Sequence, residues 1–209
     1  MSATAQDRRE REKRQRRREI LDAARGLFWE RGYSATTVPD VAEAAGVAPG
    51  TIYLYFESKS ALYAELLFEG YDLLLDRLAA ELNRDAPPRE RAEGLGDVFL
   101  GFARDFPEYF DVIFFVLRNE RCHSGASPLQ QKQVERLQAR ETACKSVAAR
   151  ILQEAGADRR GADVQDTVDA VWSMLAGTVF YFRHTGPERF NRVARAAKQL
   201  LLDALLPEG

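Results

Sequence analysis

The sequence predicts an all-α protein, and three observations carry this prediction. Apolar residues recur with helical spacing, as at Ile20, Ala24 and Leu27, so that they line one face of a helix. No segment shows the clean alternation of apolar and polar residues that a half-buried strand requires. Prolines lie between the helical stretches, where they cost no helical hydrogen bond, rather than inside them.

Composition indicates a globular chain with its own core, since 45% of its 209 residues are hydrophobic. The longest uninterrupted apolar run is Val112–Leu117, far shorter than the roughly 20 residues that span a bilayer. The N-terminal segment is charged and no apolar stretch follows it, so we expect a cytoplasmic protein without a signal peptide. Cys122 and Cys144 show neither a metal-ligand pattern nor a disulfide framework, and we expect free thiols.

The sequence predicts a series of helices, several of which end at a glycine or a proline. The first is expected from about Arg8 to Arg31, with Gly32 ending it. Two short helices follow within residues 36–56. A long helix rich in leucine is expected over Lys59–Leu82, and the segment Asp85–Pro88 ends it. Further helices are expected over residues 89–105, 107–119, 128–155, 162–183 and 188–206.

Residues 36–56 carry the pattern of a helix-turn-helix. Thr37 is a good N-cap for the first short helix, and Gly46 can adopt the positive φ of a tight turn. Pro49 begins the second short helix, from which Ile52 and Phe56 should point inward. Two short helices joined by a brief turn containing glycine form the motif that places one helix in the DNA major groove.

The outer side of the second short helix is then the candidate DNA-reading surface. Gly50 would let the backbone approach DNA closely, while Thr51 and the hydroxyls of Tyr53 and Tyr55 would face bases or phosphates. Lys59 would add a positive charge at the start of the next helix. The alternative for the two tyrosines is a place in the core of a small domain.

This stretch resembles the DNA-binding signature of the TetR (TetR/AcrR) family of transcriptional regulators. The matching motifs within residues 34–67 are TTVxDVA, AGV, GTIYxYF and SK followed by leucine. The resemblance implies a three-helix DNA-binding domain over residues 1–58 and a roughly six-helix ligand-binding and dimerisation domain over residues 59–209. It also implies a homodimeric repressor that binds palindromic operator DNA and is released by a small effector.

The resemblance assigns individual roles as well. Thr37 resembles a phosphate contact at the start of the first short helix. Gly50, Thr51 and Tyr53 resemble the recognition-helix contacts, and Tyr55 and Lys59 resemble phosphate clamps. Ala48 departs from the serine that family members often carry, and it lacks a side-chain cap worth about 1 kcal/mol.

Aromatic residues gather in the second domain. In the family such residues enclose an effector pocket, and pockets of this kind are mostly apolar. The candidate pocket residues are Tyr71, Phe102, Phe106, Phe110, Phe114, Trp172 and Phe180. The alternative is that the rings fill an ordinary core. As a set they favour a lipophilic or aromatic effector, with Arg118, Arg121, His123 and His184 as candidates to meet a polar head group.

The last two helices are the candidate dimer interface. Each carries an apolar face, and a four-helix bundle between two copies would bury both. The residues concerned are Val168, Val171, Leu175, Val179, Phe190, Val193, Ala197, Leu200 and Leu201. Packing within one chain is the alternative.

Residues 8–18 hold eight basic and two acidic residues, whereas the whole chain has a net charge of −2. The cluster is either a DNA-binding arm or a solvated helix end. Catalytic motifs are lacking: the sequence contains no GxSxG, P-loop, HExxH or dinucleotide fingerprint. We therefore expect no enzyme, no cofactor and no metal. An activator and a nonspecific DNA-binding protein stay open beside the repressor.

Overall fold

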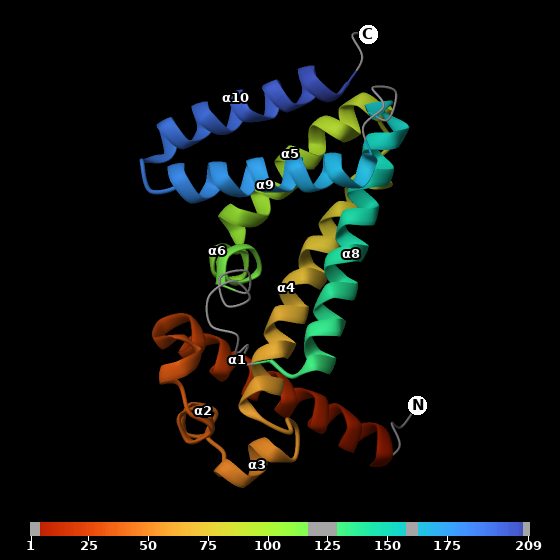
Figure 1. Cartoon of the computed structure of the whole chain (residues 1–209). Helices are drawn as coiled ribbons and strands as arrows, with labels where there is room; N and C mark the ends of the chain where they lie inside the picture. The colour runs from red at the N-terminus through yellow and green to blue at the C-terminus, as the bar shows by residue number, and fades with distance from the viewer. Residues whose placement is uncertain (1–4, 117–128, 158–162, 207–209) are drawn as a thin grey trace. The chain divides into compact units, whose positions relative to one another are not determined.

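The computed structural model describes residues 5–116, 129–157 and 163–206 (Figure 1). Every regular element within these ranges is a helix, so the predicted all-α class is confirmed. Arg118, Arg121, Cys122 and His123 lie outside the described residues. No helix in the described ranges is long and apolar enough to cross a membrane.

The chain divides into two compact units. The first contains the described residues of Met1–Glu69 and Ala126–Val134, and the second contains those of Gly70–Gly125 and Glu135–Gly209. The helix α4, Lys59–Leu82, contributes residues to both units, because the division falls after Glu69. The domain boundary after residue 58 stays a prediction.

In the first unit, a long helix is followed by two short ones. α1 spans Ala5–Ala35, although Gly32 interrupts its regular geometry with a φ of 79°. Glycine adopts this conformation at little energetic cost, and Gly32 is the residue at which the sequence predicts the end of the helix. α2 spans Val38–Ala44 and α3 spans Pro49–Tyr53. The buried core residues of this unit include Ile20, Ala24, Phe28, Val38, Val41, Ala42, Ile52, Phe56, Leu62, Tyr63, Leu66 and Leu67.

The second unit is built from the later part of α4 and the helices that follow. These are α5 Pro88–Asp105, α6 Pro107–Asp111, the π-helical stretch η1 Val112–Val116, α8 Gln131–Glu154, α9 Val164–Phe182 and α10 Pro187–Leu205. α10 packs along α9, and both contact α5 (Figure 1). The core between these helices is mostly leucine, alanine and aromatic rings.

Most helix boundaries agree with expectation to within two residues. The exceptions are the two ends of α1, predicted as Arg8 and Arg31, the start of α8, and the helix predicted over residues 107–119, which turns π-helical from Val112. The two prolines at the start of α5 also differ in role. α4 has the predicted bounds, and α8 ends before Gly156, whose φ is 86°. Pro87 and Pro88 were predicted at a helix end. Instead they start α5, because a proline in the first turn needs no N–H partner. α8 begins three residues after the predicted position, where Gln133 Oε1 accepts a hydrogen bond from the Gln130 N–H at 2.8 Å.

Candidate functional site

The start of α2 is fixed by a reciprocal capping box. Thr37 Oγ1 accepts a hydrogen bond from the Asp40 N–H at 3.3 Å, and Asp40 Oδ2 accepts one from the Thr37 N–H at 2.8 Å. The Thr37 hydroxyl also donates to Asp40 Oδ2 at 2.7 Å, and this bond, together with the one from the Thr37 N–H, lowers the pKa of the Asp40 carboxyl, because both stabilise its charged form. The Thr37 cap predicted from the sequence is confirmed, and it defines where the first short helix begins.

The turn after α2 and the inner side of α3 also follow the sequence prediction. Gly46 has a φ of 64°, and the Val47 N–H donates to the Ala42 carbonyl at 2.9 Å. Pro49 opens α3, and no side-chain hydrogen bond comes from Ala48. Ile52 and Phe56 are buried and hold the five-residue helix against its domain. The helix-turn-helix geometry is therefore present.

The opposite side of α3 is open to solvent. Tyr53 is 56% exposed, which excludes a place in the core, while Thr51 and Tyr55 are partly exposed. Gly50 is exposed, and a Cβ added there would meet no atom within 4 Å. Leu54 is 78% exposed beside them, which the sequence analysis missed. The sequence does carry a signal for this exposure, because the residues four and three positions before Leu54 are Gly50 and Thr51 rather than large apolar residues.

Lys59 lies at the start of α4 with its ammonium group already engaged. Nζ donates to the carbonyl oxygens of Tyr33 and Thr36, at 2.9 Å each. It also lies 4.1 Å from the centroid of the Tyr33 ring. Lys59 therefore ties the start of α4 to the last turn of α1 and to Thr36, which follows it, a role that the sequence did not reveal.

Two ion pairs join α1 to the beginning of α4. Arg17 pairs with Glu65 at 2.8 Å, and its guanidinium lies 4.8 Å from the centroid of the Phe56 ring. Arg25 pairs with Glu69 at 2.8 Å. These contacts hold the helix that follows α3 against α1, and so they help to fix the orientation of the helix-turn-helix.

Four aromatic residues of the second unit, Phe99, Phe110, Phe114 and Trp172, form a packed cluster. Phe99 contacts Phe110, Phe114 and Trp172 edge to face, with centroids 5.4, 5.0 and 5.1 Å away. Phe102 and the half-buried Phe106 form a further pair with centroids 5.6 Å apart. Most of the candidate pocket residues are therefore brought into the core of this unit, as is Tyr71, which is 4% exposed.

Phe180 does not join this cluster. It is 51% exposed on α9 and contacts Tyr181, which is also exposed. Val168, Leu175 and Val179 of the same helix are buried within the chain, so packing within one chain accounts for these three residues. The apolar residues left exposed on α9 and α10 are Met174, Phe180, Tyr181 and Leu200.

Two small apolar cavities lie between α5, α8 and α9. One of about 30 Å³ extends to α10 and Lys198, and one of about 20 Å³ is lined by Phe99 and Trp172. They share Leu95, Leu152, Val171 and Leu175, none of which was predicted as a pocket residue. Ligand pockets typically measure about 300–1,000 Å³, so an effector of that size must displace side chains to enter here.

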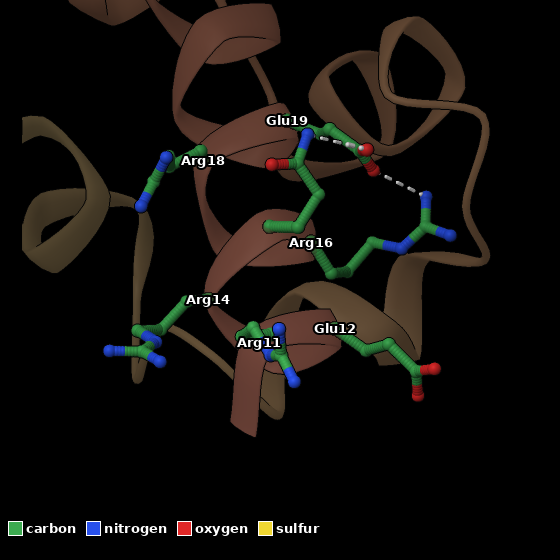
Figure 2. A pocket seen from close by; sticks show the side chains of 7 residues that line it. Arg11, Glu12, Arg14, Arg16, Arg18 and Glu19 are labelled. Carbon is green, nitrogen blue, oxygen red and sulfur yellow. Dashed lines mark hydrogen bonds and ion pairs between the residues drawn. The ribbon is translucent and has the colours of Figure 1, made fainter. Parts of the chain in front are cut away.

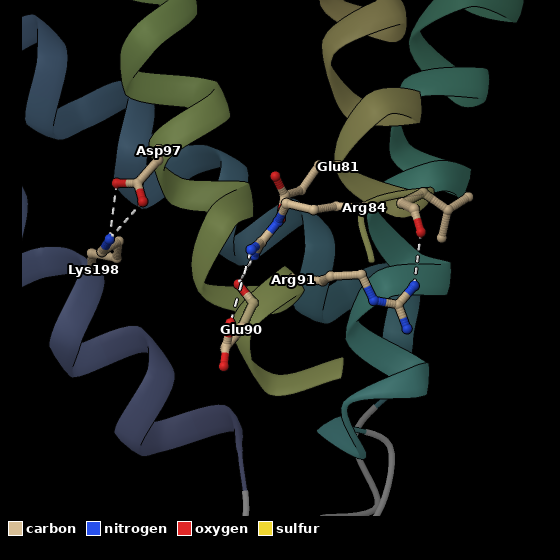
Figure 3. A network of polar contacts seen from close by, with 7 residues as sticks. Glu81, Arg84, Glu90, Arg91, Asp97 and Lys198 are labelled. Carbon is tan, nitrogen blue, oxygen red and sulfur yellow. Dashed lines mark hydrogen bonds and ion pairs between the residues drawn. The ribbon is translucent and has the colours of Figure 1, made fainter. Parts of the chain in front are cut away.

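Charged side chains on and beside α5 form several ion pairs (Figure 3). Lys198 pairs with Asp97 at 2.8 Å, and Arg84 pairs with Glu81 at 2.8 Å. Arg91 pairs with Glu154 at 2.8 Å, which joins α5 to α8. On the candidate head-group residue His184, Nε2 accepts a hydrogen bond from Arg183 Nε at 3.0 Å, and the residue is exposed. Charges in this region are therefore largely paired with each other.

Comparison with known proteins gives a match for the helix-turn-helix region. Residues 20–66 match the family model described as "Bacterial regulatory proteins, tetR family". The transcriptional repressor KstR2 of Mycobacterium tuberculosis is 42% identical over 80 residues, which are 38% of this chain and 40% of that protein. The fatty acid metabolism regulator protein of Bacillus subtilis is 35% identical over 80 residues, which are 38% and 41%.

The fold has relatives over nearly its whole length. PfmR from Thermus thermophilus, a TetR family transcriptional regulator, has a TM-score of 0.68 and 26% identity. The match covers 90% of this chain and 99% of PfmR. In sequence, by contrast, the chain spans about 40% of the length of the curated relatives it matches. Sequence similarity thus concentrates in the helix-turn-helix, while structural similarity extends through both units.

Proposed function

The chain belongs to the TetR family of bacterial regulatory proteins, and we propose that it is a ligand-responsive repressor that binds palindromic operator DNA as a homodimer. The observation that carries this proposal is α3, a short helix anchored by buried Ile52 and Phe56 with its other side open to solvent. The major groove of DNA admits one such helix. The name of KstR2 as a transcriptional repressor supports the direction of regulation.

The proposed DNA contacts divide into base-reading and phosphate-binding residues. Gly50, Thr51 and Tyr53 would approach base edges, since they lie on the open side of α3. Thr37, Tyr55 and Lys59 would bind phosphates at its flanks. For Lys59, two of the three ammonium protons already go to backbone carbonyls, so one is left for a phosphate.

The proposed effector is a lipophilic or aromatic small molecule that enters the second unit. The aromatic cluster of Phe99, Phe110, Phe114 and Trp172 and the adjoining apolar cavities support this class. The name of the Bacillus subtilis relative, a fatty acid metabolism regulator, agrees with it. Exposed apolar residues on α9 and α10, among them Tyr181 and Leu200, support an interface with a second copy.

The direct test is selection of duplexes from a random-sequence pool by the wild-type chain, followed by footprinting and light scattering. We expect a palindromic sequence, two protected half-sites about 34 Å apart, and a mass of twice 23.6 kDa. A monomer that binds the selected duplex tightly would contradict the dimer. A reporter whose transcription falls when the chain is removed would identify an activator instead.

A further inference from the structure

The first part of α1 extends beyond its domain as a single exposed helix. Residues 5–19 precede Ile20, the first buried residue in the described part of the chain, and they add about 22 Å of helix at 1.5 Å per residue. Side chains 6–16 and Arg18 are all exposed. The basic cluster is therefore part of a helix with fixed faces, and its charges can be placed on those faces.

The cations of this extension lie on three sides of the helix. Arg9 and Lys13 occupy one of them and have no ion pair within the described residues, while Arg17 beside them pairs with Glu65. The two other sides differ in how their arginines are paired. On one side, Arg8 pairs with Glu12 at 3.6 Å and Arg16 pairs with Glu19 at 2.8 Å. On the other side lie Arg11, Arg14 and Arg18, which we call the arginine stripe; Figure 2 shows Arg14 and Arg18 pointing away from Glu12 and Glu19. Their spacing of three and four residues places them on one face.

The arginine stripe keeps its charge, while the face that carries Arg8 and Arg16 is neutralised by glutamates. Arg14 and Arg18 have no ion pair or hydrogen bond within the described residues, and Arg11 reaches only a backbone oxygen, the carbonyl of Asp7 at 3.2 Å. Like charges four residues apart repel each other, so this face lacks a partner that supplies negative charge. Regularly spaced phosphates are such a partner.

The helix proposed to read DNA lacks cations that could bind phosphates, so another cationic surface must supply them. α3, Pro49–Tyr53, contains no lysine or arginine, and the Lys59 ammonium is largely occupied by backbone carbonyls. Cations that neutralise phosphates supply most of the nonspecific affinity of DNA-binding proteins. The arginine stripe belongs to the same compact unit as α3 and carries free guanidinium groups.

We propose that Arg11, Arg14 and Arg18 bind the sugar–phosphate backbone of duplex DNA beyond the base pairs that α3 reads. This inference rests on the proposed function, because it assigns a second contact to the same DNA-binding protein. Arg8 and Arg16, which are paired to glutamates, take no direct part in this contact.

The test compares two double variants of the full chain that change the net charge equally. Arg14→Gln with Arg18→Gln removes two charges of the arginine stripe, and Arg8→Gln with Arg16→Gln removes two paired charges from the other side. Glutamine is a good helix former, and circular dichroism checks that the helix is kept. Affinity for a wild-type-selected duplex with at least ten base pairs of flank is measured at several salt concentrations.

We expect the stripe variant to lower the affinity at low salt by at least tenfold. It should also make the slope of log K against log salt shallower by about 0.9 for each phosphate that is no longer neutralised. The paired-side variant should stay within threefold of wild type. An equal effect of both variants, or an unchanged slope in the stripe variant, overturns the inference. If the wild type selects no duplex sequence, the proposed function fails instead, and a mixed-sequence duplex still measures the stripe.

Discussion

At the scale of single residues, Lys59 combines a structural contact with a proposed DNA contact. Its ammonium binds the carbonyl oxygens of Tyr33 and Thr36 at 2.9 Å. Because hydrogen bonds to charged groups contribute about 1.5–3 kcal/mol, Lys59→Ala should lower the free energy of unfolding by an amount of that order. Urea denaturation measures this, with Lys13→Ala as a control at an exposed lysine.

The same variant separates positioning from phosphate contact. If Lys59 contacts a phosphate, Lys59→Ala should also make the salt dependence of operator binding shallower by about one unit. A loss of affinity with an unchanged salt slope would mean that Lys59 only positions the helix-turn-helix. Thr51→Ala, by contrast, should change the preference among operator sequences.

Cys144 should be chemically inert in the native protein. Its side chain is fully buried, its thiol donates to the Tyr71 carbonyl at 3.7 Å, and burial raises its pKa to about 12. At pH 8 on the order of one thiol in ten thousand is then ionised, and the thiolate is the reactive form. In a Cys122→Ser variant, a disulfide reagent at pH 8 should label Cys144 only after denaturant is added. Rapid labelling of the native protein would contradict the burial.

Sequence predicts residue roles well when the partners are close along the chain. The Thr37 cap acts on Asp40, three residues away, and the turn at Gly46 needs only its own backbone. The partners of Lys59 lie 23 and 26 residues away, and no local pattern reports them. The pairing of Arg16 with Glu19, but of neither Arg14 nor Arg18 with an acid, likewise depends on which helix face each occupies.

At the scale of elements, α3 allows a clean test of backbone approach to DNA. A Cβ at Gly50 meets no atom within 4 Å in the free protein. Gly50→Ala should therefore leave the free energy of unfolding unchanged or raise it by up to about 1 kcal/mol, since alanine favours the helix. If Gly50 must lie close to DNA, operator affinity should fall at the same time. An alanine variant with wild-type affinity would exclude close approach at this position.

Helix packing in the second unit depends on another glycine. A Cβ at Gly70 of α4 would lie 2.7 Å from Tyr109 Cδ1 and 3.0 Å from Ile113 Cδ1. Gly70→Ala should cost about 1–3 kcal/mol of stability, because these buried side chains must move. Gly26→Ala, in an exposed part of α1 with no atom near the added Cβ, is the control and should be neutral or stabilising. Thermal denaturation of both variants checks the prediction.

The bounds of a helix were predictable where the spacing of its apolar residues agrees with the positions of glycine and proline at its ends. α4 runs over the predicted residues Lys59–Leu82, since leucines mark its face throughout. The start of α5 was predicted to within one residue, but the place of Pro88 inside it was not, because paired prolines can either follow one helix or open the next, and only packing decides between them. The two small apolar cavities were missed for a related reason: Leu95, Leu152, Val171 and Leu175 look like ordinary core residues in the sequence.

At the scale of the whole molecule, the proposed repressor must link an effector in the second unit to DNA binding by the first. α4 is the covalent candidate for this link, since it contributes residues to both units. An effector that binds the DNA-competent and the DNA-incompetent forms equally shifts nothing. To move the balance from 1:99 to 99:1, its binding must differ by about 5.5 kcal/mol between the two forms.

A lipophilic effector can supply this difference. Burial of one methylene contributes about 0.8 kcal/mol, so a chain of about ten carbons that is buried in only one form exceeds the required amount. The two described cavities, of about 30 and 20 Å³, are too small for such a chain, so its entry would require the side chains around them, among them Trp172, to repack. In the proposed mechanism, that repacking would couple the effector to the form of the protein.

We therefore expect fatty acids, acyl thioesters or aromatic acids to release the operator-bound protein, with potency that rises with chain length. Trp172→Ala should change this potency by at least tenfold, because Trp172 lines a cavity, whereas Phe180→Ala, half exposed on α9, should leave the potency within threefold of wild type. Fluorescence anisotropy of labelled operator measures the release. Release by small hydrophilic compounds alone would contradict the lipophilic effector, yet it would leave the proposed repressor standing, because DNA binding depends on α2 and α3.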